Sequence, residues 1–412
     1  MSDYVPEEVV AQILLRLPAK SVSESRCVCK SWCALINDPT FISNYTHFAI
    51  KNITSNSQVI LRHYDRVNSQ ERFTLHHDGI SFSPIKELDL PFENKPDSFN
   101  VIGICYGLVC LLDYHQKGLS KSVIVWNPSL ESCVRIMFKF TAANFESVHG
   151  FGFDPKSVDY KVVRIVVRDH FIIGVRDAPR PVVQVFALKV GSWRNVTTGD
   201  TSLCRITVKT PQAYVNGTLH WVGYDTESHH VAQRIQRRLV LLAFDLREEV
   251  FKELNVPDEL KTDELAYGRE QKLFIGALDQ KLALMHYYTQ WYNSPSYDGC
   301  CIWMMKEYGL GESWTKQFKI DLRLGLGKMA GLRRNGEMLL VTRYNEELVS
   351  FNTVNRKMQK LGIYGETWSF FLDTYVESLV LMQRINGVLK MPTPPFNATS
   401  SSKAHRGETS GV

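Results

Sequence analysis

The spacing of hydrophobic residues changes near residue 45, from a helical pattern to a strand pattern. Before that point, apolar residues recur three and four positions apart, which is typical of one stripe along a helix. They are Val9, Val10, Ile13, Leu14 and Leu17. Pro6 suits the first turn of this helix, and Leu17-Pro18 ends it because the residue before a proline avoids helical dihedral angles.

Two further helices are expected before residue 45. Ser21-Val22-Ser23-Glu24 has the form of a capping box, which predicts the start of the second helix. Trp32, Leu35 and Ile36 give the next apolar face, and Asp38-Pro39 ends it. A unit of roughly 40 residues seldom buries enough surface to be stable alone. Its large apolar side chains either pack on one another and on the next domain, or leave one face open for the helices of a partner.

Nearly everything from residue 57 to residue 382 reads as short strands in a repeating order. Each repeat begins with a strand, a tight turn and a strand. The clearest turns are Asn216-Gly217 and Asn335-Gly336, because these residues tolerate the positive φ of a hairpin. An apolar strand, a polar turn and another strand follow, as at 123–128, 241–246 and 348–353. Each repeat thus supplies about four strands, the content of one propeller blade.

Six repeats, with starts near residues 58, 98, 148, 210, 272 and 325, have a mean spacing of about 53 residues, close to the kelch-like period. The spacing predicts an all-β propeller of six blades, with seven as the alternative since loop lengths vary. Residues 375–381 follow as a lone strand, which we expect to pair with the first blade and close the ring. Residues 391–412 lack the apolar content to fold, which predicts a disordered tail.

Composition and charge exclude some classes of protein. The chain has 412 residues, of which 44% are hydrophobic and 22% charged, as in globular proteins. No apolar run approaches the ~18 residues of a membrane-spanning helix, and the acidic N-terminus does not resemble a targeting peptide. The net charge of +5 is too small to indicate a nucleic-acid partner, and nine irregularly spaced cysteines indicate reduced thiols. We therefore expect a cytoplasmic or nuclear protein that binds neither membrane nor nucleic acid.

Motifs along most of the chain resemble a known family. The helical segment looks like an F-box, through residues Val5–Val10, Ile13–Val22, Arg26–Trp32 and Leu35–Phe41. The strand region resembles the F-box-associated, kelch-related domain of plant F-box proteins, through Gly107–Leu111, Trp126–Ser129, Gly150–Asp154, Asp159–Arg164, Val215–Trp221, Ile302–Gly309, Glu312–Lys316 and Tyr375–Leu379. The resemblance implies an α+β multidomain fold: a three-helix F-box over 1–45, a linker over 46–57 and a propeller over 58–390.

The resemblance also implies a function, the substrate receptor of an SCF-type ubiquitin ligase. The F-box would bind an SKP-type linker protein and through it a cullin scaffold, and the propeller would hold a target protein. Such an adaptor needs no catalytic residue, cofactor or metal of its own. The residues implied in linker binding, each of which could instead belong to the helical core, are Pro6, Ile13, Leu14, Leu17, Pro18, Val28 and Trp32.

The F-box motif departs from the family pattern at two places. Val5-Pro6 replaces the usual Leu-Pro, a small loss of volume. Glu24-Ser25 stands where the family tends to have a basic residue and an apolar or aromatic one. The loss of an apolar side chain at Ser25 is expected to weaken linker binding.

Two segments are candidates for target binding. Tyr288, Trp291 and Tyr292 belong to an aromatic stretch that leads into a loop, and interface hot spots favour tyrosine and tryptophan. Arg176 and Arg180 lie in a second loop-like segment. The alternatives are strand core for the aromatic residues and an ordinary solvated connection for the arginines.

Other chemistries find little support in the sequence. Cys27, Cys29 and Cys33 are close together but have no nearby histidine partner for zinc, and lie on an expected helix. A propeller enzyme acting on a small molecule would need carboxylates or metal ligands around its channel, and no acidic position recurs between repeats. A scaffold that binds the linker protein without delivering a target remains an alternative that the sequence does not separate from the adaptor.

Overall fold

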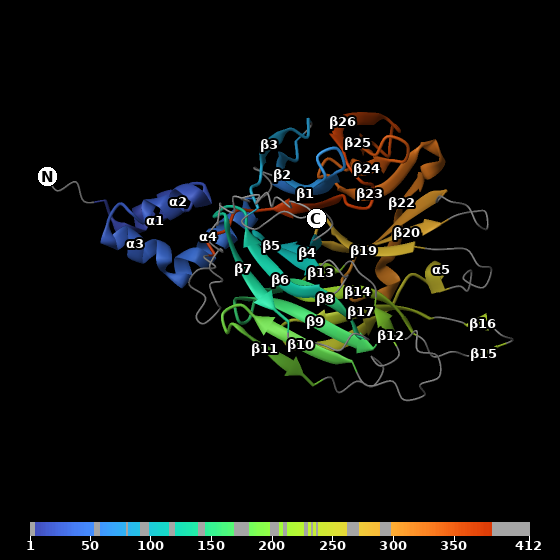
Figure 1. Cartoon of the computed structure of the whole chain (residues 1–412), viewed down its shortest axis with the longest axis horizontal. Coiled ribbons are helices and arrows are strands. Elements are labelled where there is room, and N and C mark those ends of the chain that lie inside the picture. Colours follow the sequence, from blue (N-terminus) through green and yellow to red (C-terminus); the bar gives the residue numbers. More distant parts are fainter. Residues whose placement is uncertain are drawn as a thin grey trace, which may run out of the picture.

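The computed structural model describes residues 5–52, 58–79, 81–90, 99–114, 120–138, 145–168, 181–197, 206–208, 212–225, 230–231, 234–235, 238–261, 272–288 and 298–380. N-terminal helices precede a six-bladed β-propeller, as the hydrophobic patterns predict. Figure 1 shows the helices at one side of the propeller, beside the blade that contains β5 and β7. The expected tail over 391–412 lies outside the described residues.

Four helices, rather than the three expected, form the N-terminal unit: α1 (Glu7–Leu14), α2 (Ala19–Ser25), α3 (Lys30–Asn37) and α4 (Pro39–Lys51). Asp38-Pro39 ends α3 as predicted but also begins α4. The Asp38 carboxylate accepts hydrogen bonds from the backbone N–H groups of Thr40 and Phe41, at 2.6 and 3.3 Å, and Pro39 occupies the first helical turn. Since α4 continues to Lys51, the first half of the segment expected as a linker is helical.

The capping-box prediction for the second helix is wrong. Helix α2 begins at Ala19, directly after Pro18, so Ser21 lies inside the helix and does not cap it. The hydroxyl of Ser25 instead donates to the backbone carbonyl of Ser21 at 2.8 Å. Proline fixes the backbone that enters the helix, and this local constraint acts two residues before the Ser-x-x-Glu motif.

Six sheets form the propeller, and we number them as blades 1 to 6 along the chain. Blade 1 contains β1 (Gln58–Asp65), β2 (Gln70–His77), β3 (Pro84–Glu87) and β27 (Phe371–Tyr375). Blade 2 contains β4 (Phe99–Cys105), β5 (Leu108–Tyr114), β6 (Ser120–Asn127) and β7 (Ser132–Met137). Blade 3 contains β8 (Phe145–Asp154), β9 (Asp159–Arg168), β10 (Val182–Ala187) and β11 (Ser192–Val196).

Blade 4 has five strands, namely β12 (Ile206–Val208), β13 (Ala213–Val215), β14 (Thr218–Asp225), β17 (Arg238–Asp245) and β18 (Val250–Leu254). A short hairpin of β15 (His230–Val231) and β16 (Arg234–Ile235) lies between its strands in sequence, and helix α5 (Asp258–Lys261) follows it. Blade 5 contains β19 (Lys272–Leu278), β20 (Lys281–Tyr288), β21 (Gly299–Met305) and β22 (Trp314–Asp321). Blade 6 contains β23 (Leu326–Leu332), β24 (Met338–Thr342), β25 (Glu347–Phe351) and β26 (Met358–Tyr364).

Tight turns open the blades where the sequence predicts them. Asn216 and Gly217 both have positive φ, 51° and 72°, and join β13 to β14. Tyr106 and Gly107 do the same between β4 and β5, with φ of 40° and 84°. Both central residues of such a turn need positive φ if the turn is to match the twist of the flanking strands.

The ring closes as expected, because a strand from the end of the propeller domain pairs with one from its beginning. The predicted position of this closing strand was wrong. Strand β27 pairs antiparallel with β1, with Gln58 opposite Tyr375. The closing strand therefore spans 371–375 and not 375–381. Beyond Tyr375 the chain leaves the sheet, and the Asn127 side-chain amide donates to the carbonyls of Ser378 and Val380, at 3.0 and 3.1 Å. We call residues 376–380 the closing segment.

Hydrophobic side chains fill the spaces between adjacent blades. Trp126 and Trp221 are fully buried, one between blades 1 and 2 and the other between blades 3 and 4. Within the described residues, no helix is long and apolar enough to span a membrane.

Candidate functional site

Helix α1 carries two apolar faces rather than the single stripe that the spacing suggested. Val10 and Leu14 point into the helical core, with 8% and 0% of their surface exposed. Val9 and Ile13, four residues apart on the other face, are 46% and 51% exposed. Burial of one pair and exposure of the other means that the core of the unit is complete without the outer pair.

The exposed apolar residues of the helical unit form what we call the docking face. It consists of Val5, Pro6, Val9, Ile13, Leu17, Pro18 and Val28. Val28, in the connection between α2 and α3, is 64% exposed. Monomeric proteins seldom expose several large apolar residues on so small a unit unless the surface binds a partner.

The structure exposes some of the residues implied in linker binding and buries others. Pro6, Ile13, Leu17, Pro18 and Val28 lie on the docking face. Leu14 is fully buried in the helical core, which is the alternative role considered for it. Trp32 is half-buried and packs against the same core. Val9 was in the predicted stripe but was not singled out, although its spacing of four from Ile13 places both on one face.

The corner between α1 and α2 is held from two sides. The hydroxyl of Tyr45, in α4, lies 2.8 Å from the carbonyl oxygen of Leu17. The carboxylate of Glu377, in the closing segment, accepts a hydrogen bond of 2.7 Å from the backbone N–H of Ala19 and lies 3.3 Å from the Tyr45 hydroxyl. Burial, followed by the charge of Glu377, raises the pKa of Tyr45, which therefore stays protonated.

The propeller also contributes to the hydrophobic core of the helices. Leu379 of the closing segment is 2% exposed and packs with Val10, Leu14 and Ile36. Leu130, in the turn between β6 and β7, packs against the same core. Next to it, Lys20 and Glu131 form an exposed ion pair at 3.1 Å. The helices are thus joined to blade 2 and to the end of the ring by shared core residues.

Strand direction places the two ends of the propeller relative to the helices. Strand β27 packs beside β4 and β23, the first strands of the neighbouring blades, so it is the inner strand of blade 1. Glu377 follows β27 and contacts the helices, whereas Trp368 precedes it. Five residues of strand span about 17 Å. We call the end of the propeller at Trp368 the distal face.

Aromatic and apolar side chains are exposed on the distal face. Tyr344, in the turn between β24 and β25, is 86% exposed, Leu324 is 64% exposed and Trp368 is 46% exposed. Gly365 and Thr367 hydrogen-bond to Glu346, at 3.1 and 3.4 Å, and so join the turn of Tyr344 to the segment of Trp368. We call Leu324, Tyr344 and Trp368 the aromatic patch.

Lysine ammonium groups flank Trp368. Lys272 and Lys328 lie 4.9 and 5.5 Å from the centre of its ring. Lys328 also donates to the carbonyls of Trp368 and Phe370, both at 3.0 Å. Burial, followed by the charge of Arg62, lowers the pKa of Lys328 to about 8. These contacts fix the backbone of Trp368 while its ring remains partly exposed.

Of the residues considered for target binding, only Tyr288 falls within the described part of the chain. It lies at the distal end of β20, half-buried against Gly299 of the paired strand. Trp291, Tyr292, Arg176 and Arg180 lie outside the described residues. The described strands that precede these residues in the sequence, β20 and β9, are second strands of their blades and end at the distal face.

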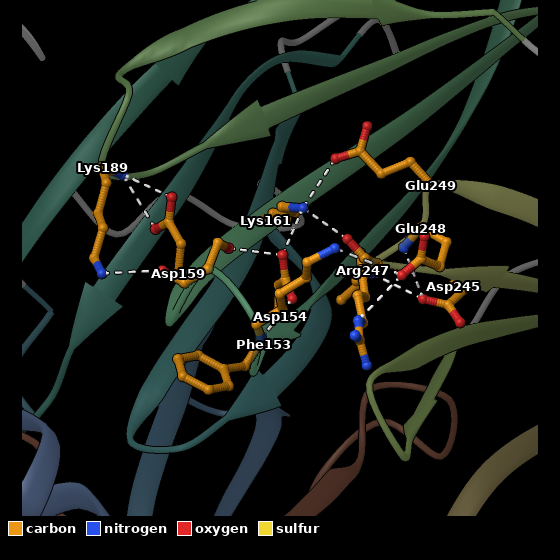
Figure 2. A network of polar contacts seen from close by, with 12 residues as sticks. Phe153, Asp154, Asp159, Lys161, Lys189, Asp245, Arg247, Glu248 and Glu249 are labelled. Carbon is orange, nitrogen blue, oxygen red and sulfur yellow. Dashed lines mark hydrogen bonds and ion pairs between the residues drawn. The ribbon is translucent and has the colours of Figure 1, made fainter.

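The charged motif Asp159-Tyr160-Lys161 has a structural role between blades. Lys161 donates to Glu249 and to the carbonyl of Leu246 in blade 4, at 2.9 and 2.6 Å, and pairs with Asp154 at 2.8 Å (Figure 2). Burial opposes the charge on Lys161, but the hydrogen bonds to Asp154 and Glu249 outweigh it and raise the pKa of the ammonium. Tyr160 donates to the carbonyl of Tyr106 in blade 2 at 2.9 Å.

The fold and its exposed surfaces define a class of protein: a β-propeller joined to a helical unit that exposes apolar residues. Family models agree with this description, since residues 4–44 match the F-box domain and residues 58–382 match the F-box associated beta propeller domain. The chain belongs to the family of F-box proteins with an F-box-associated β-propeller domain.

The chain is similar to F-box proteins of Arabidopsis thaliana along most of its length. The chain is 28% identical over 410 residues to the F-box protein CPR1 of Arabidopsis thaliana, covering 92% of this chain and 89% of the relative. An F-box/kelch-repeat protein of the same plant is 26% identical over 330 residues, covering 77% of this chain and 79% of the relative. Among solved structures, the periplasmic gluconolactonase of Pseudomonas aeruginosa matches with a TM-score of 0.40 and 9% identity, covering 78% of this chain and 99% of that one.

Proposed function

We propose that this protein is the substrate-recognition subunit of an SCF-type ubiquitin ligase. The docking face binds an SKP-type linker protein, which joins it to a cullin scaffold, and the propeller holds a target protein. The observation that carries the proposal is the exposure of Val9 and Ile13 on an F-box whose own core is already filled by Val10 and Leu14. Removal of such residues from water is the main favourable term in protein association.

Catalysis in this proposal comes from proximity alone. The adaptor tethers the target near a ubiquitin-conjugating enzyme, so target lysines reach a high effective concentration near the charged thioester. Such a role requires no catalytic residue from this chain. Tight attachment of the F-box to the propeller supports it, because a short-range tether of fixed geometry gives a higher effective concentration than a loose one.

The target is proposed to bind at the distal face, with the aromatic patch at its centre. Tyrosine and tryptophan supply a large contact area and are enriched among the residues that dominate interface energetics. The patch lies at the opposite end of β27 from the F-box, so target and linker protein would not compete for space.

Co-purification with an SKP-type linker protein tests the first half of the proposal. The full chain should bind, the Leu17→Ala/Pro18→Ala variant should not, and Val354→Ala should bind normally because Val354 is 93% exposed in the propeller turn between β25 and β26 and is not a docking-face residue. Failure of the unaltered chain to bind would refute the adaptor function.

Protein turnover in cells tests the second half. A target should have a longer half-life in cells that express either the Leu17→Ala/Pro18→Ala variant or Trp368→Ala/Tyr344→Ala than in cells that express the unaltered protein. If the unaltered chain binds the linker protein but no protein has a longer half-life with both variants, the chain binds the linker without delivering a target through this patch.

A further inference from the structure

Besides the shared hydrophobic core, the F-box and the propeller share polar contacts at the corner that ends α1 and begins α2. The proposed linker-binding residues Leu17 and Pro18 form this corner. Ala19 follows it, and its backbone N–H is one of the unpaired donors at the start of α2. A side chain just before a helix accepts from the N–H of its second or third residue, so the N–H of the first residue needs an acceptor from elsewhere. Pro18 occupies that position here and offers no side-chain acceptor.

Glu377 supplies the missing acceptor from a distant part of the sequence. Its carboxylate oxygen lies 2.7 Å from the Ala19 nitrogen, across 358 residues of chain. A negative charge at this end of α2 also interacts favourably with the helix dipole. The sequence near α2 does not reveal this cap, because the capping residue belongs to the closing segment of the propeller.

Tyr45 extends the same contact to the other side of the corner. Its hydroxyl has a single proton and lies 2.8 Å from the Leu17 carbonyl and 3.3 Å from the Glu377 carboxylate. The backbone on both sides of Pro18 is thus held by one connected group of polar atoms. Leu379, two residues after Glu377, anchors the closing segment in the F-box core.

We propose that Glu377 is a positioning residue for linker docking. It does not lie on the docking face but holds the Leu17-Pro18 corner in the shape that the linker protein binds. The closing segment therefore couples completion of the propeller ring to the binding competence of the F-box. This inference rests on the proposed function and adds a residue of the propeller to the docking apparatus.

The affinity of purified full chain for a recombinant SKP-type linker protein, measured by calorimetry, tests the inference. Loss of a hydrogen bond to a charged group that orders a binding segment corresponds to about a tenfold weaker affinity, which we expect for Glu377→Ala. Glu377→Gln keeps an oxygen acceptor for the Ala19 N–H and should recover most of the affinity. Tyr45→Phe, which removes only the hydroxyl, should also weaken binding.

Two control variants separate positioning from general stability. Glu131→Gln changes a carboxylate at the same interface, but its ion pair with Lys20 is 51–62% exposed, so affinity should stay unchanged. Lys161→Met removes ion pairs at the junction of blades 3 and 4 and no ion pair with the F-box, and should also leave affinity unchanged in the folded protein. Amide hydrogen exchange should become faster at Ala19 in Glu377→Ala and not in Lys161→Met.

The possible outcomes are distinguishable. If the unaltered chain binds and Glu377→Ala binds equally well, the positioning role is overturned while the adaptor function stands. If Lys161→Met weakens binding as much as Glu377→Ala does, the effect is one of stability and the inference is also overturned. If the unaltered chain does not bind the linker protein, the proposed function fails and the positioning role fails with it.

Discussion

Ile13 and Leu14 are neighbours in α1 that should respond to mutation in opposite ways. Ile13 is 51% exposed on the docking face and Leu14 is fully buried in the helical core. Complete burial of an isoleucine side chain contributes about 1.5–3 kcal/mol. Docking can bury only the exposed half of Ile13, so Ile13→Ala should weaken linker binding by about 1 kcal/mol, or roughly fivefold in Kd. Ile13→Asp should abolish binding, because docking would also strip water from a carboxylate.

Leu14→Ala should instead destabilise the fold. Truncation of a buried leucine costs about 2–5 kcal/mol, since it leaves a cavity as well as losing apolar burial. Denaturant unfolding of both variants measures the free energy of unfolding, and calorimetry with the linker protein measures Kd. We expect Ile13→Ala to change mainly Kd and Leu14→Ala mainly the free energy of unfolding.

Val354→Asp serves as the control for Ile13→Asp, since it introduces the same charge at a residue that is 93% exposed on the propeller. It should leave both measurements unchanged. The reasoning would be refuted if Ile13→Asp bound the linker protein with normal affinity, because the docking face would then lie elsewhere.

Three further predictions concern the propeller. Lys161→Met should lower the free energy of unfolding by about 3 kcal/mol, because it leaves the buried Asp154 carboxylate without its cation, whereas Glu249 keeps Arg194. A loss below about 1 kcal/mol in denaturant unfolding would contradict this role. Gly107→Ala should destabilise the protein more than Gly309→Ala. Both glycines have φ near 83°, so the backbone strain is the same in both variants. A Cβ at Gly107 would lie 2.5 Å from Ser378, whereas a Cβ at Gly309 would enter open space. Equal effects would show that the closing segment gives way easily. Asp373→Asn should stabilise the protein above pH 7. Burial raises the pKa of Asp373 from 3.8 to about 7, so its ionisation reduces stability as the pH rises between these values. We expect a gain of up to about 4 kcal/mol at pH 8 and little at pH 4, and a gain that does not depend on pH would contradict this cause.

The repeat pattern was sufficient to predict the propeller because nearly all strands of a blade follow one another in the sequence. The expected blade starts near 58, 98, 272 and 325 lie within one residue of the starts of β1, β4, β19 and β23. Asn216-Gly217 marked its hairpin because the turn requires positive φ at both residues. Tight turns can be predicted from the sequence because they depend on adjacent residues.

Interactions between distant segments were not predictable in the same way. The F-box was expected as three helices with a capping box at Ser21, but Pro18 begins α2 and Glu377 caps it. The closing strand was expected at 375–381, as a lone strand after the last repeat. Leu379 is apolar for another reason, since it fills the F-box core and not a sheet. A hydrophobic residue indicates burial, but the pattern does not identify what buries it.

Shared core residues also determine how the two parts of the protein can be separated experimentally. A propeller without residues 1–45 would expose Leu379 and Leu130 and leave the Glu377 carboxylate without its partners. Such a fragment could fail to bind the linker protein simply because it aggregates, so its failure would not identify the docking face. An isolated F-box would lack Leu379 from its core and the cap of α2. Single substitutions on the docking face, such as Ile13→Ala, leave these shared contacts intact and therefore test the adaptor function directly.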